Sequence, residues 1–535
     1  MTTVSPYLSS GEGSFAVATP HWAATDAACA SWRSGGNAVD AALAASAVLA
    51  VVYPHMCGLG GDLFGIVADA NSQTVVNGSG AYAETVEVES MRRQHIDMPV
   101  HGPLSVTVPG VVAAWGELAR RFGRRPLSRA IEPALELAER GIPTAPSLGR
   151  AISSERMRLE SDPGLRELFI PLGKPLGSGD QLVQPKLART LRTLMIEGSR
   201  AMYDGQLAAG LVDYLARMGS ALSAQDFRHH HTEVCPPLRA RYREHEVLVP
   251  PPNSQGFLLP EILSCIERSG MPANHLGEGA ATVAQVYLAT AADRDHFLAD
   301  PRRVKVPIDR FLSVAHTKDI LARRYPAPET VPDRKLGLGD TVGIVVGERD
   351  GLWVSINQSL YDSFGAGILE PSSGVIYQNR GSAFSLDLTA ANALAGATRP
   401  PHTLLPVIVL RSGSPVLGSA TMGGSAHAQI HSQILMAILD RHMSPSEAVD
   451  SPRWLVGGVK QGAGATVVAE ARVPETVIAR LKASALVVRT LGDWDELVGH
   501  AQVVSYGSNN SLSAGSDRRA DGAAAVLGEG DRTFQ

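Results

Sequence analysis

The alternation of apolar and polar positions predicts a chain of mixed helices and strands. The longest apolar run covers residues 38–52, with Asp40 as an acidic interruption and Pro54 just beyond it. Asn37 is a suitable N-cap, and the carboxylate of Asp40 suits the N-terminal end of a helix dipole. The run is shorter than the roughly 18 residues that a membrane span needs. We therefore predict a buried helix over residues 38–52.

Apolar residues spaced three and four apart predict further helices, and shorter runs bounded by turn residues predict strands. The predicted helices cover 113–122, 127–140, 188–196, parts of 258–324, and 427–442. A glycine-dense turn at 57–61 leads into a strand, and strands are also expected at 246–249, 374–377, 406–410 and 467–470. A dinucleotide-binding loop would instead open a helix, so these glycines do not indicate one.

The clearest strand signal is a hairpin that follows a stretch rich in proline and glycine. Residues 325–340 carry several of these breakers, which predicts an exposed linker. Residues 341–346 then have the pattern of a strand, 348–351 form a turn with the Asp-Gly signature, and 352–357 return as a second strand. Together the elements indicate an α+β, layered fold without an internal repeat.

Length and composition narrow the class of protein. The chain has 535 residues, 44% of them hydrophobic, which provides a large core and excludes disorder as the dominant state. Length alone suggests roughly three to four domain-sized units. The net charge of −5 gives no basic field for nucleic acid or an anionic membrane surface, so we expect no nucleic-acid or membrane partner and a small-molecule ligand instead.

The cysteines and the N-terminal residues bear on the compartment. The four cysteines are far apart and form no C-x-x-C pair, so neither a zinc site nor a disulfide framework is expected. The first residues lack the basic and apolar regions of a secretory signal. We therefore predict a reduced, cytoplasmic location. The cysteines are Cys29, Cys57, Cys235 and Cys265.

Most familiar catalytic signatures are absent from the sequence, including G-x-S-x-G, H-E-x-x-H and the Walker loop. His229, His230 and His231 are adjacent, so they point in different directions on a regular element, and we do not expect them to share a metal ion. Cys57 has no electropositive neighbour in the sequence and is interpreted as a buried, inert thiol. We predict no metal and no cofactor.

The junction between Asp340 and Thr341 suggests an N-terminal nucleophile. An exposed loop here delivers a small hydroxyl residue to the first position of a strand. If the 340–341 peptide bond is cut, Thr341 gains a free α-amine that can act as the general base for its own hydroxyl. The alternative without a catalytic role is that Thr341 simply occupies the first position of a strand, where threonine is common.

Two downstream features support the catalytic interpretation. Ser359 follows the hairpin and could hydrogen-bond Thr341 across the sheet. Gly423 and Gly424 precede the helix expected to begin near His427, and backbone N–H groups at a helix N-terminus can form an oxyanion hole. His427 itself could touch a substrate, although we expect a histidine at a helix N-terminus to face solvent.

With these motifs in place, the sequence resembles the γ-glutamyltransferase family of N-terminal-nucleophile hydrolases over nearly its whole length. The resemblance implies a four-layer αββα sandwich that cleaves itself into a large subunit, residues 1–340, and a small one, residues 341–535. It implies Thr341 as nucleophile, Ser359 in place of a supporting threonine, and Gly423 with Gly424 as oxyanion hole. The matching segments are 35–42, 57–62, 250–256, 364–368, 399–400, 423–425, 447–453 and 517–522.

The family's glutamate-binding residues do not carry over. Where the family has an arginine, this chain reads Asn77-Gly-Ser79-Gly80, and where it has a Ser-Ser pair the residues are His402 and Thr403. An ammonium-binding Asn, Gln and Asp are replaced by Tyr361, Arg380 and Ala383. Losing an acid and gaining Arg380 predicts an anionic or α-keto ligand without a free α-amine.

These replacements resemble the family's amidohydrolase branch, which implies cleavage of an amide or similarly activated acyl bond next to a small carboxylate. A related biosynthetic branch for alkylproline units implies C–C cleavage that releases an oxalyl unit. The residues also leave open a γ-glutamyltransferase or hydrolase and a non-catalytic relic of the fold. Self-generated subunits could assemble further. The short stretch 384–399 predicts a pocket more open than one covered by a lid.

Overall fold

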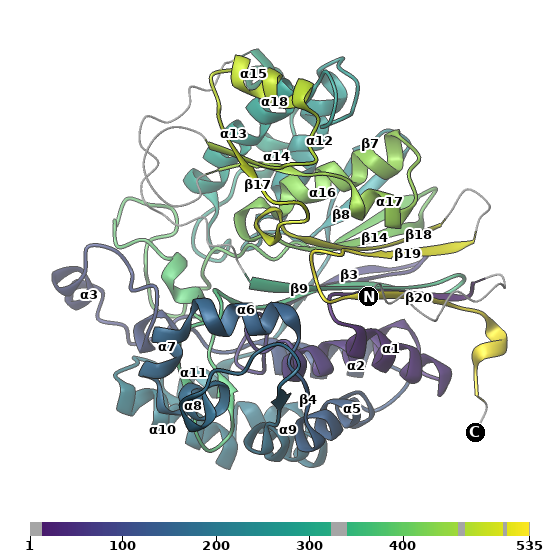
Figure 1. The fold of residues 1–535 in the computed structure, drawn as a ribbon. Coiled ribbons are helices and arrows are strands. Elements are labelled where there is room, and N and C mark those ends of the chain that lie inside the picture. The colour runs from purple at the N-terminus through teal and green to yellow at the C-terminus, as the bar shows by residue number, and fades with distance from the viewer. Residues whose placement is uncertain (1–12, 323–339, 458–465, 507–510, 534–535) are drawn as a thin grey trace.

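The computed structural model describes residues 13–322, 340–457, 466–506 and 511–533. The linker predicted at 325–340 lies outside these ranges except for Asp340. Within them, two large antiparallel sheets pack face to face between two helical layers (Figure 1). This is the predicted αββα sandwich.

The first sheet has the order β20-β1-β9-β10-β2-β3-β6 and the second has the order β19-β18-β14-β13-β8-β7. Strands from before and after residue 340 lie side by side in both. The strands of the first sheet, in that order, are Ala523–Leu527, Phe15–Thr19, Asp340–Glu348, Trp353–Tyr361, Asp62–Ala68, Gln73–Gly78 and Glu233–Cys235. Those of the second are Leu512–Ser516, His500–Tyr506, Ser414–Met422, Val407–Arg411, His245–Val249 and Leu238–Tyr242.

The smaller sheets pair β15 with β16 and β17, β11 with β12, and β4 with β5. They lie outside the sandwich sheets. Their strands are β4 Ile142–Pro143, β5 Gln181–Leu182, β11 Leu369–Glu370, β12 Val375–Ile376, β15 Trp454–Val456, β16 Thr466–Glu470 and β17 Val487–Leu491.

One helical layer covers the outer face of the first sheet, in the lower half of Figure 1. Its central helix α2, Ala38–Val52, is buried along its whole length, and Asn37 and Asp40 form the predicted cap. The helices of this half are α1 Trp22–Arg33, α3 Val88–Gln94, α4 Val111–Phe122, α5 Leu127–Arg140, α6 Pro146–Ser154, α7 Arg156–Ser161, α8 Pro163–Phe169, α9 Pro185–Glu197, α10 Gln206–Met218 and α11 Ala224–His229.

The opposite helical layer packs on the second sheet through a separate apolar cluster. The helix predicted at 427–442 is divided: an α-helix ends at Leu435 and a π-helical turn continues over Met436–Asp440. The helices of this half are α12 Leu258–Arg268, α13 Ala280–Phe297, α14 Ile308–Phe311, α15 Val314–Ala322, α16 His427–Leu435, α17 Pro445–Asp450 and α18 Glu475–Ala483.

The predicted hairpin is confirmed as β9 and β10, at the centre of the first sheet. A third apolar cluster, which includes Val345 and Ala420, fills the space between the sheets. Alternation along β9 therefore turns Thr341 and Gly343 toward this interior. A Cβ on Gly343 would lie 2.8 Å from the backbone of Ala420, so the sheets approach closely beside Thr341. No helix in the described ranges is long and apolar enough to cross a membrane.

Candidate active site

Three polar residues form a row across the middle of the first sheet, on the face that looks toward the second sheet. Thr341 on β9 pairs with Ser359 on β10, and Ser359 pairs with Asp62 on β2. Directly opposed residues of antiparallel strands point to the same face. Ser79 follows Gly78, which pairs with Leu63, and extends the row. Sheet register therefore gathers side chains that are far apart in the sequence.

A chain of hydrogen bonds joins the Thr341 hydroxyl to the peptide bond before it. Thr341 Oγ1 donates to Ser359 Oγ at 3.1 Å, and Ser359 Oγ donates to the carbonyl oxygen of Asp340 at 2.5 Å. The backbone N–H of Tyr361 donates to Ser359 Oγ at 2.8 Å. Ser359 thus polarises the carbonyl of the 340–341 bond while it holds the hydroxyl that could attack it.

The side-chain carboxyl of Asp340, next to the peptide bond in question, has a raised pKa. Burial raises its pKa to about 8, opposed by a hydrogen bond from Ser363 and reinforced by Asp362 and Glu155. At pH 7 this side chain is therefore mostly neutral. A neutral carboxyl adds no negative charge beside the carbonyl of the same residue, where an oxyanion would develop.

The backbone bends sharply just after Ser359. The pairing register shifts between Ser359 and Tyr361, and Tyr361 has a φ of +82°. A positive φ is rare for a bulky residue and costs on the order of 1–3 kcal/mol. The bend brings the Tyr361 ring beneath the guanidinium of Arg380, with 4.0 Å from Arg380 Cζ to the ring centroid.

Arg380 is buried, and its hydrogen bonds to described residues do not use all of its guanidinium N–H groups. Its Nε donates to the carbonyl of Pro401 at 2.8 Å, its Nη2 contacts the same oxygen, and its Nη1 donates to Thr403 Oγ1 at 3.2 Å. A guanidinium carries five N–H groups, so its bonds to the described part of the chain leave one on each Nη atom. Ala383 ends the short helical turn that begins at Arg380 and offers no charge. The arrangement can receive a carboxylate.

His402 and Asp62 form a second buried pair near Arg380. His402 Nε2 lies 3.1 Å from Asp62 Oδ2, and its ring packs on Phe64. Burial lowers the pKa of His402, and the charge of Arg380 lowers it further. Burial raises the pKa of Asp62 to about 7, although Arg380 and the N–H groups of Gly80 and Gly110 oppose the rise.

This shift predicts a pH dependence for anion binding. Below pH 7 Asp62 is mostly neutral, and above pH 7 its carboxylate offsets the charge of Arg380. We expect the Kd of a small dicarboxylate such as oxalate to rise between pH 6 and pH 8, by up to about tenfold per pH unit beyond the pKa. Calorimetry would measure it, and Asp62→Asn should flatten the profile. An equally steep profile in Asp62→Asn would contradict this role.

Sequence reasoning assigned no role to Asp62, Asn253 or Gln255, although each lies in a segment that carried the family resemblance. Asn253 Nδ2 donates to Ser79 Oγ at 3.2 Å and to the carbonyl of Pro400 at 2.7 Å. Gln255 Nε2 donates to the carbonyls of Thr403 at 2.9 Å and Gly424 at 3.1 Å. These amides tie Ser79 and Thr403 to the rest of the site.

Gly423 and Gly424 follow β14 at the Thr341 end of the second sheet. Asn357 on β10 links β14 to β9 at this end of the sheets. Its Nδ2 donates to the carbonyl of Thr421 on β14 at 2.8 Å and to the carbonyl of Val342 on β9 at 3.4 Å. The glycines have φ values of +154° and +53°, and a Cβ on Gly423 would overlap the side chain of Ile430. Gly424 begins a 3-10 turn, so neither glycine belongs to the α-helix itself.

The prediction that His427 faces solvent is wrong. Its side chain is fully buried, with an exposed fraction of 0%. Helix α16 packs against the second sheet through its first turn as well as its later turns, so its N-terminal residue lies in the interior. Thr341 is likewise 0% exposed, so the intact chain does not test the prediction of a more open pocket.

The other candidate residues have structural surroundings. Cys57 is buried and burial raises its thiol pKa, as the inert interpretation predicts. His230 stacks on Tyr203, while His231 contacts the carbonyl of His229. In the described ranges these histidines are not part of a group with metal-ligand spacing.

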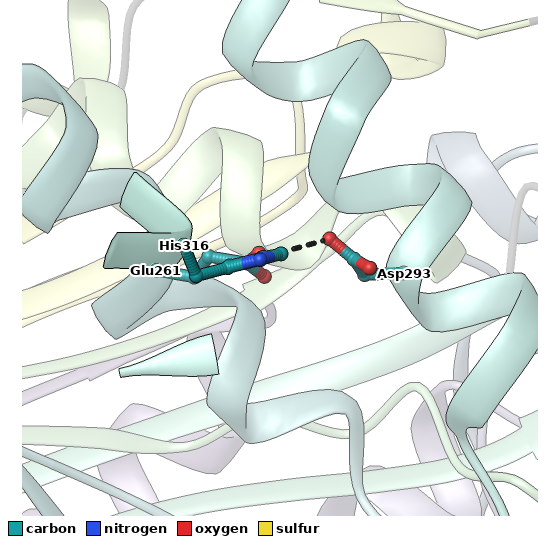
Figure 2. A group of neighbouring side chains, drawn as sticks. All are labelled: Glu261, Asp293 and His316. Carbon is teal, nitrogen blue, oxygen red and sulfur yellow. Dashed lines mark hydrogen bonds and ion pairs between the residues drawn. The ribbon is translucent and has the colours of Figure 1, made fainter. Parts of the chain in front are cut away.

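One described group elsewhere has that spacing: Glu261, Asp293 and His316, from α12, α13 and α15 (Figure 2). His316 Nε2 lies 2.8 Å from Glu261 Oε1 and 3.1 Å from Asp293 Oδ2. These are hydrogen-bond distances, and the pKa of His316 is raised by its bond to Glu261. Burial raises the pKa of Glu261 to about 8. The group is therefore a buried hydrogen-bonded cluster that joins α15 to α12 and α13.

Comparison with known proteins agrees with this geometry. The sequence model of the family Gamma-glutamyltranspeptidase matches residues 24–527. The glutathione hydrolase-like YwrD proenzyme of Bacillus subtilis is 34% identical, over 95% of this chain and 97% of that protein. The oxamate amidohydrolase proenzyme of Klebsiella pneumoniae is 33% identical over the same shares. The cephalosporin acylase of Bacillus halodurans superposes with a TM-score of 0.88 at 27% identity, covering 99% of both chains.

Proposed function

The chain belongs to the gamma-glutamyltranspeptidase family of N-terminal-nucleophile hydrolases, and from this premise we propose that it cleaves itself before Thr341 and then hydrolyses an acyl bond next to a small carboxylate. The observation that carries the proposal is the hydrogen-bond chain from the Thr341 hydroxyl through Ser359 to the Asp340 carbonyl. It aligns a nucleophile, a relay and a polarised carbonyl at one peptide bond.

Self-cleavage would proceed as an acyl shift followed by hydrolysis. The Thr341 oxygen bonds to the Asp340 carbonyl carbon, its proton passes through Ser359 to the leaving nitrogen, and the C–N bond breaks. Water then hydrolyses the ester, leaving a carboxylate on Asp340 and a free amine and hydroxyl on Thr341. The amine serves as the base in turnover, where the substrate acyl group moves to Thr341 and water removes it.

The proposed products are a large subunit of residues 1–340 and a small subunit of residues 341–535. Strand pairing supports the two subunits staying together after cleavage. In the first sheet β9 pairs with β1 and β10 pairs with β2. In the second sheet β13 pairs with β8. Each sheet thus contains strands from both products, and separation would expose both inter-sheet and helix-packing surfaces.

Ser359→Ala should slow self-cleavage. The change removes the hydroxyl that donates to the Asp340 carbonyl and receives the Thr341 proton, and loss of one such donor typically costs about 10²–10³-fold in rate. Denaturing electrophoresis after timed incubation would measure the uncut fraction. Ser359→Thr, which keeps a hydroxyl, should cleave more readily than Ser359→Ala. Equal rates for Ser359→Ala and the wild type would contradict the relay.

The proposed substrate is an amide, or similarly activated acyl compound, of a small dicarboxylic or α-keto acid. Arg380 supports this choice because it is buried beside Thr403 and Tyr361 and retains N–H donors. The neutral residues at 361, 383 and 403 provide no carboxylate to bind a free α-amine. The relatives named oxamate amidohydrolase and cephalosporin acylase are compatible with acyl chemistry other than γ-glutamyl transfer.

The decisive experiment combines processing with a substrate panel. Purified wild type should give two bands of about two-thirds and one-third of the mass, and mass spectrometry should find Thr341 at the new N-terminus. The panel would contain oxalyl, malonyl and succinyl amides, a γ-glutamyl anilide, and a vinylogous keto acid for C–C cleavage. Turnover of short acidic amides supports the proposal. Turnover of the γ-glutamyl compound alone, or oxalate release from the keto acid alone, would replace it.

A further inference from the structure

The cluster of Glu261, Asp293 and His316 lies outside the candidate active site, in the helical layer that covers the second sheet (Figures 1 and 2). Its three ligand atoms lie within 4.8 Å of one another. His316 is 55 positions from Glu261 and 23 from Asp293, so no local motif marks the group in the sequence. Helix packing alone brings one imidazole and two carboxyl groups together.

The polar atoms of the cluster are incompletely satisfied. Glu261 is fully buried, and its Oε1 lies 2.8 Å from His316 Nε2, whereas its Oε2 has no hydrogen-bond partner among the described residues. His316 Nε2 also faces Asp293 Oδ2 at 3.1 Å, although a ring nitrogen carries at most one N–H group. One N–H group therefore serves two carboxyl groups. Buried polar atoms without a partner are rare and call for an explanation.

Another unpaired carboxyl oxygen shows what sets this cluster apart. Asp162 Oδ2 is also buried without a partner, but Asp162 is the N-cap of α8, and its Oδ1 accepts from the backbone N–H of Leu165 at 2.8 Å. The role of Asp162 is thus complete without a ligand. In the part of the chain that the structure describes, only the Glu261 cluster combines an unpaired buried carboxyl oxygen with metal-ligand spacing.

The charge of the cluster favours a cation. Among the described residues, the ion pairs of Glu261 and Asp293 are both with His316, so two acidic groups depend on one imidazole. Burial raises the pKa of Glu261 to about 8, which means that a proton relieves the surplus negative charge at neutral pH. A divalent cation bound between the same atoms would replace that proton and supply two positive charges.

The distances between the donor atoms suit a divalent ion of the first transition row. Such ions bind nitrogen and oxygen at about 2.0–2.2 Å, so two ligands at right angles lie about 3 Å apart. The distances from His316 Nε2 to the two carboxyl oxygens, 2.8 and 3.1 Å, are close to this value. Imidazole nitrogen favours zinc and its neighbours, whereas magnesium and calcium prefer oxygen ligands. Asp293 is partly exposed and gives the ion access from solvent.

We propose that Glu261, Asp293 and His316 bind one zinc or manganese ion, through the imidazole nitrogen and one oxygen of each carboxylate, with water in the remaining positions. The ion would fasten α15 to α12 and α13. Since α15 ends at Ala322, the last described residue before Asp340, the ion would hold the final described helix of the proposed large subunit on its layer. The site does not depend on Thr341 or on self-cleavage.

Calorimetry on the untagged, metal-depleted full chain tests the site, with Zn²⁺ and Mn²⁺ as separate probes. We expect one ion per chain, no displacement by excess Mg²⁺, and a higher melting temperature with the ion, because a ligand that binds only the folded state stabilises it. Asp293→Asn keeps the size of the side chain and an acceptor oxygen but removes the charge. It should weaken binding at least about tenfold, a loss typical even of partners outside the ligand set.

Asp295→Asn is the matched control, because it removes the same charge from an exposed position two residues farther along α13. It should bind the ion as the wild type does. Equal affinities of Asp293→Asn and Asp295→Asn, or a wild type that binds neither ion at one equivalent, would overturn the proposal and leave a cluster held by hydrogen bonds alone. If Asp293→Asn fails to fold, anomalous diffraction from zinc-soaked wild-type crystals decides. A peak between the three side chains supports the site, and its absence there contradicts it.

Discussion

Thr341→Ala should leave the protein as a single uncut chain without detectable turnover. The change removes the Oγ1 atom that donates to Ser359 and would attack the Asp340 carbonyl. Without cleavage the α-amine of residue 341 stays in a peptide bond, so both the nucleophile and its base are lost. Removing the nucleophile of comparable enzymes lowers the rate by about 10⁴-fold or more. Electrophoresis and the acyl-amide panel would measure both losses.

Thr341→Ser is the matched control because it keeps a hydroxyl in the same register. It should still cleave itself, more slowly, and retain turnover. The alanine substitution removes few contacts, since the position is defined by backbone pairing with Ser359. The melting temperature of Thr341→Ala should therefore stay near that of the wild-type precursor before cleavage. Two bands, or full activity, from Thr341→Ala would refute the assignment of this residue.

Arg380→Gln should strongly weaken the use of anionic substrates while sparing self-cleavage. Charge-assisted hydrogen bonds contribute about 1.5–3 kcal/mol each, so losing the available N–H pair predicts at least about 100-fold lower kcat/KM. The effect should appear mainly in KM, because the guanidinium binds the part of the substrate that does not react. Self-cleavage depends on Ser359 and the Asp340 carbonyl, neither of which has a hydrogen bond to Arg380.

Arg380→Lys tests whether charge alone suffices. A lysine keeps the positive charge but lacks the fork that contacts Pro401, Thr403 and a ligand together, so we expect only partial recovery. Neutral acyl amides serve as the reference, and their turnover should change little in either variant. Unchanged KM for oxalyl and succinyl amides in Arg380→Gln would show that the carboxylate binds elsewhere.

The sequence contained enough information to predict the architecture and the hairpin that carries Thr341 and Ser359. The cap at Asn37 and the breakers around β9 and β10 are local signals, and the structure confirms the elements they predicted. The opposition of Thr341 and Ser359 also followed from strand pairing, because a tight turn fixes the register of its two strands.

What sequence reasoning missed depends on contacts between distant segments. The raised pKa of Asp62 arises from burial beside His402, which is 340 positions away. His427 was expected to face solvent because a helix N-terminus is usually exposed, but here it is packed against the second sheet. The burial of that ring cannot be deduced from local pattern, since it depends on the closeness of the two sheets.

The outer strands of the first sheet offer a way to separate maturation from catalysis. β1 and β20 pair with Phe15 opposite Leu527, so the start of the first described strand lies beside the end of the last one. A circularly permuted gene could join these ends and begin translation at position 341. Removal of the initiator methionine would then expose the threonine amine directly. Such a protein would carry a preformed nucleophile on an uninterrupted chain, and its kinetics would report on turnover alone.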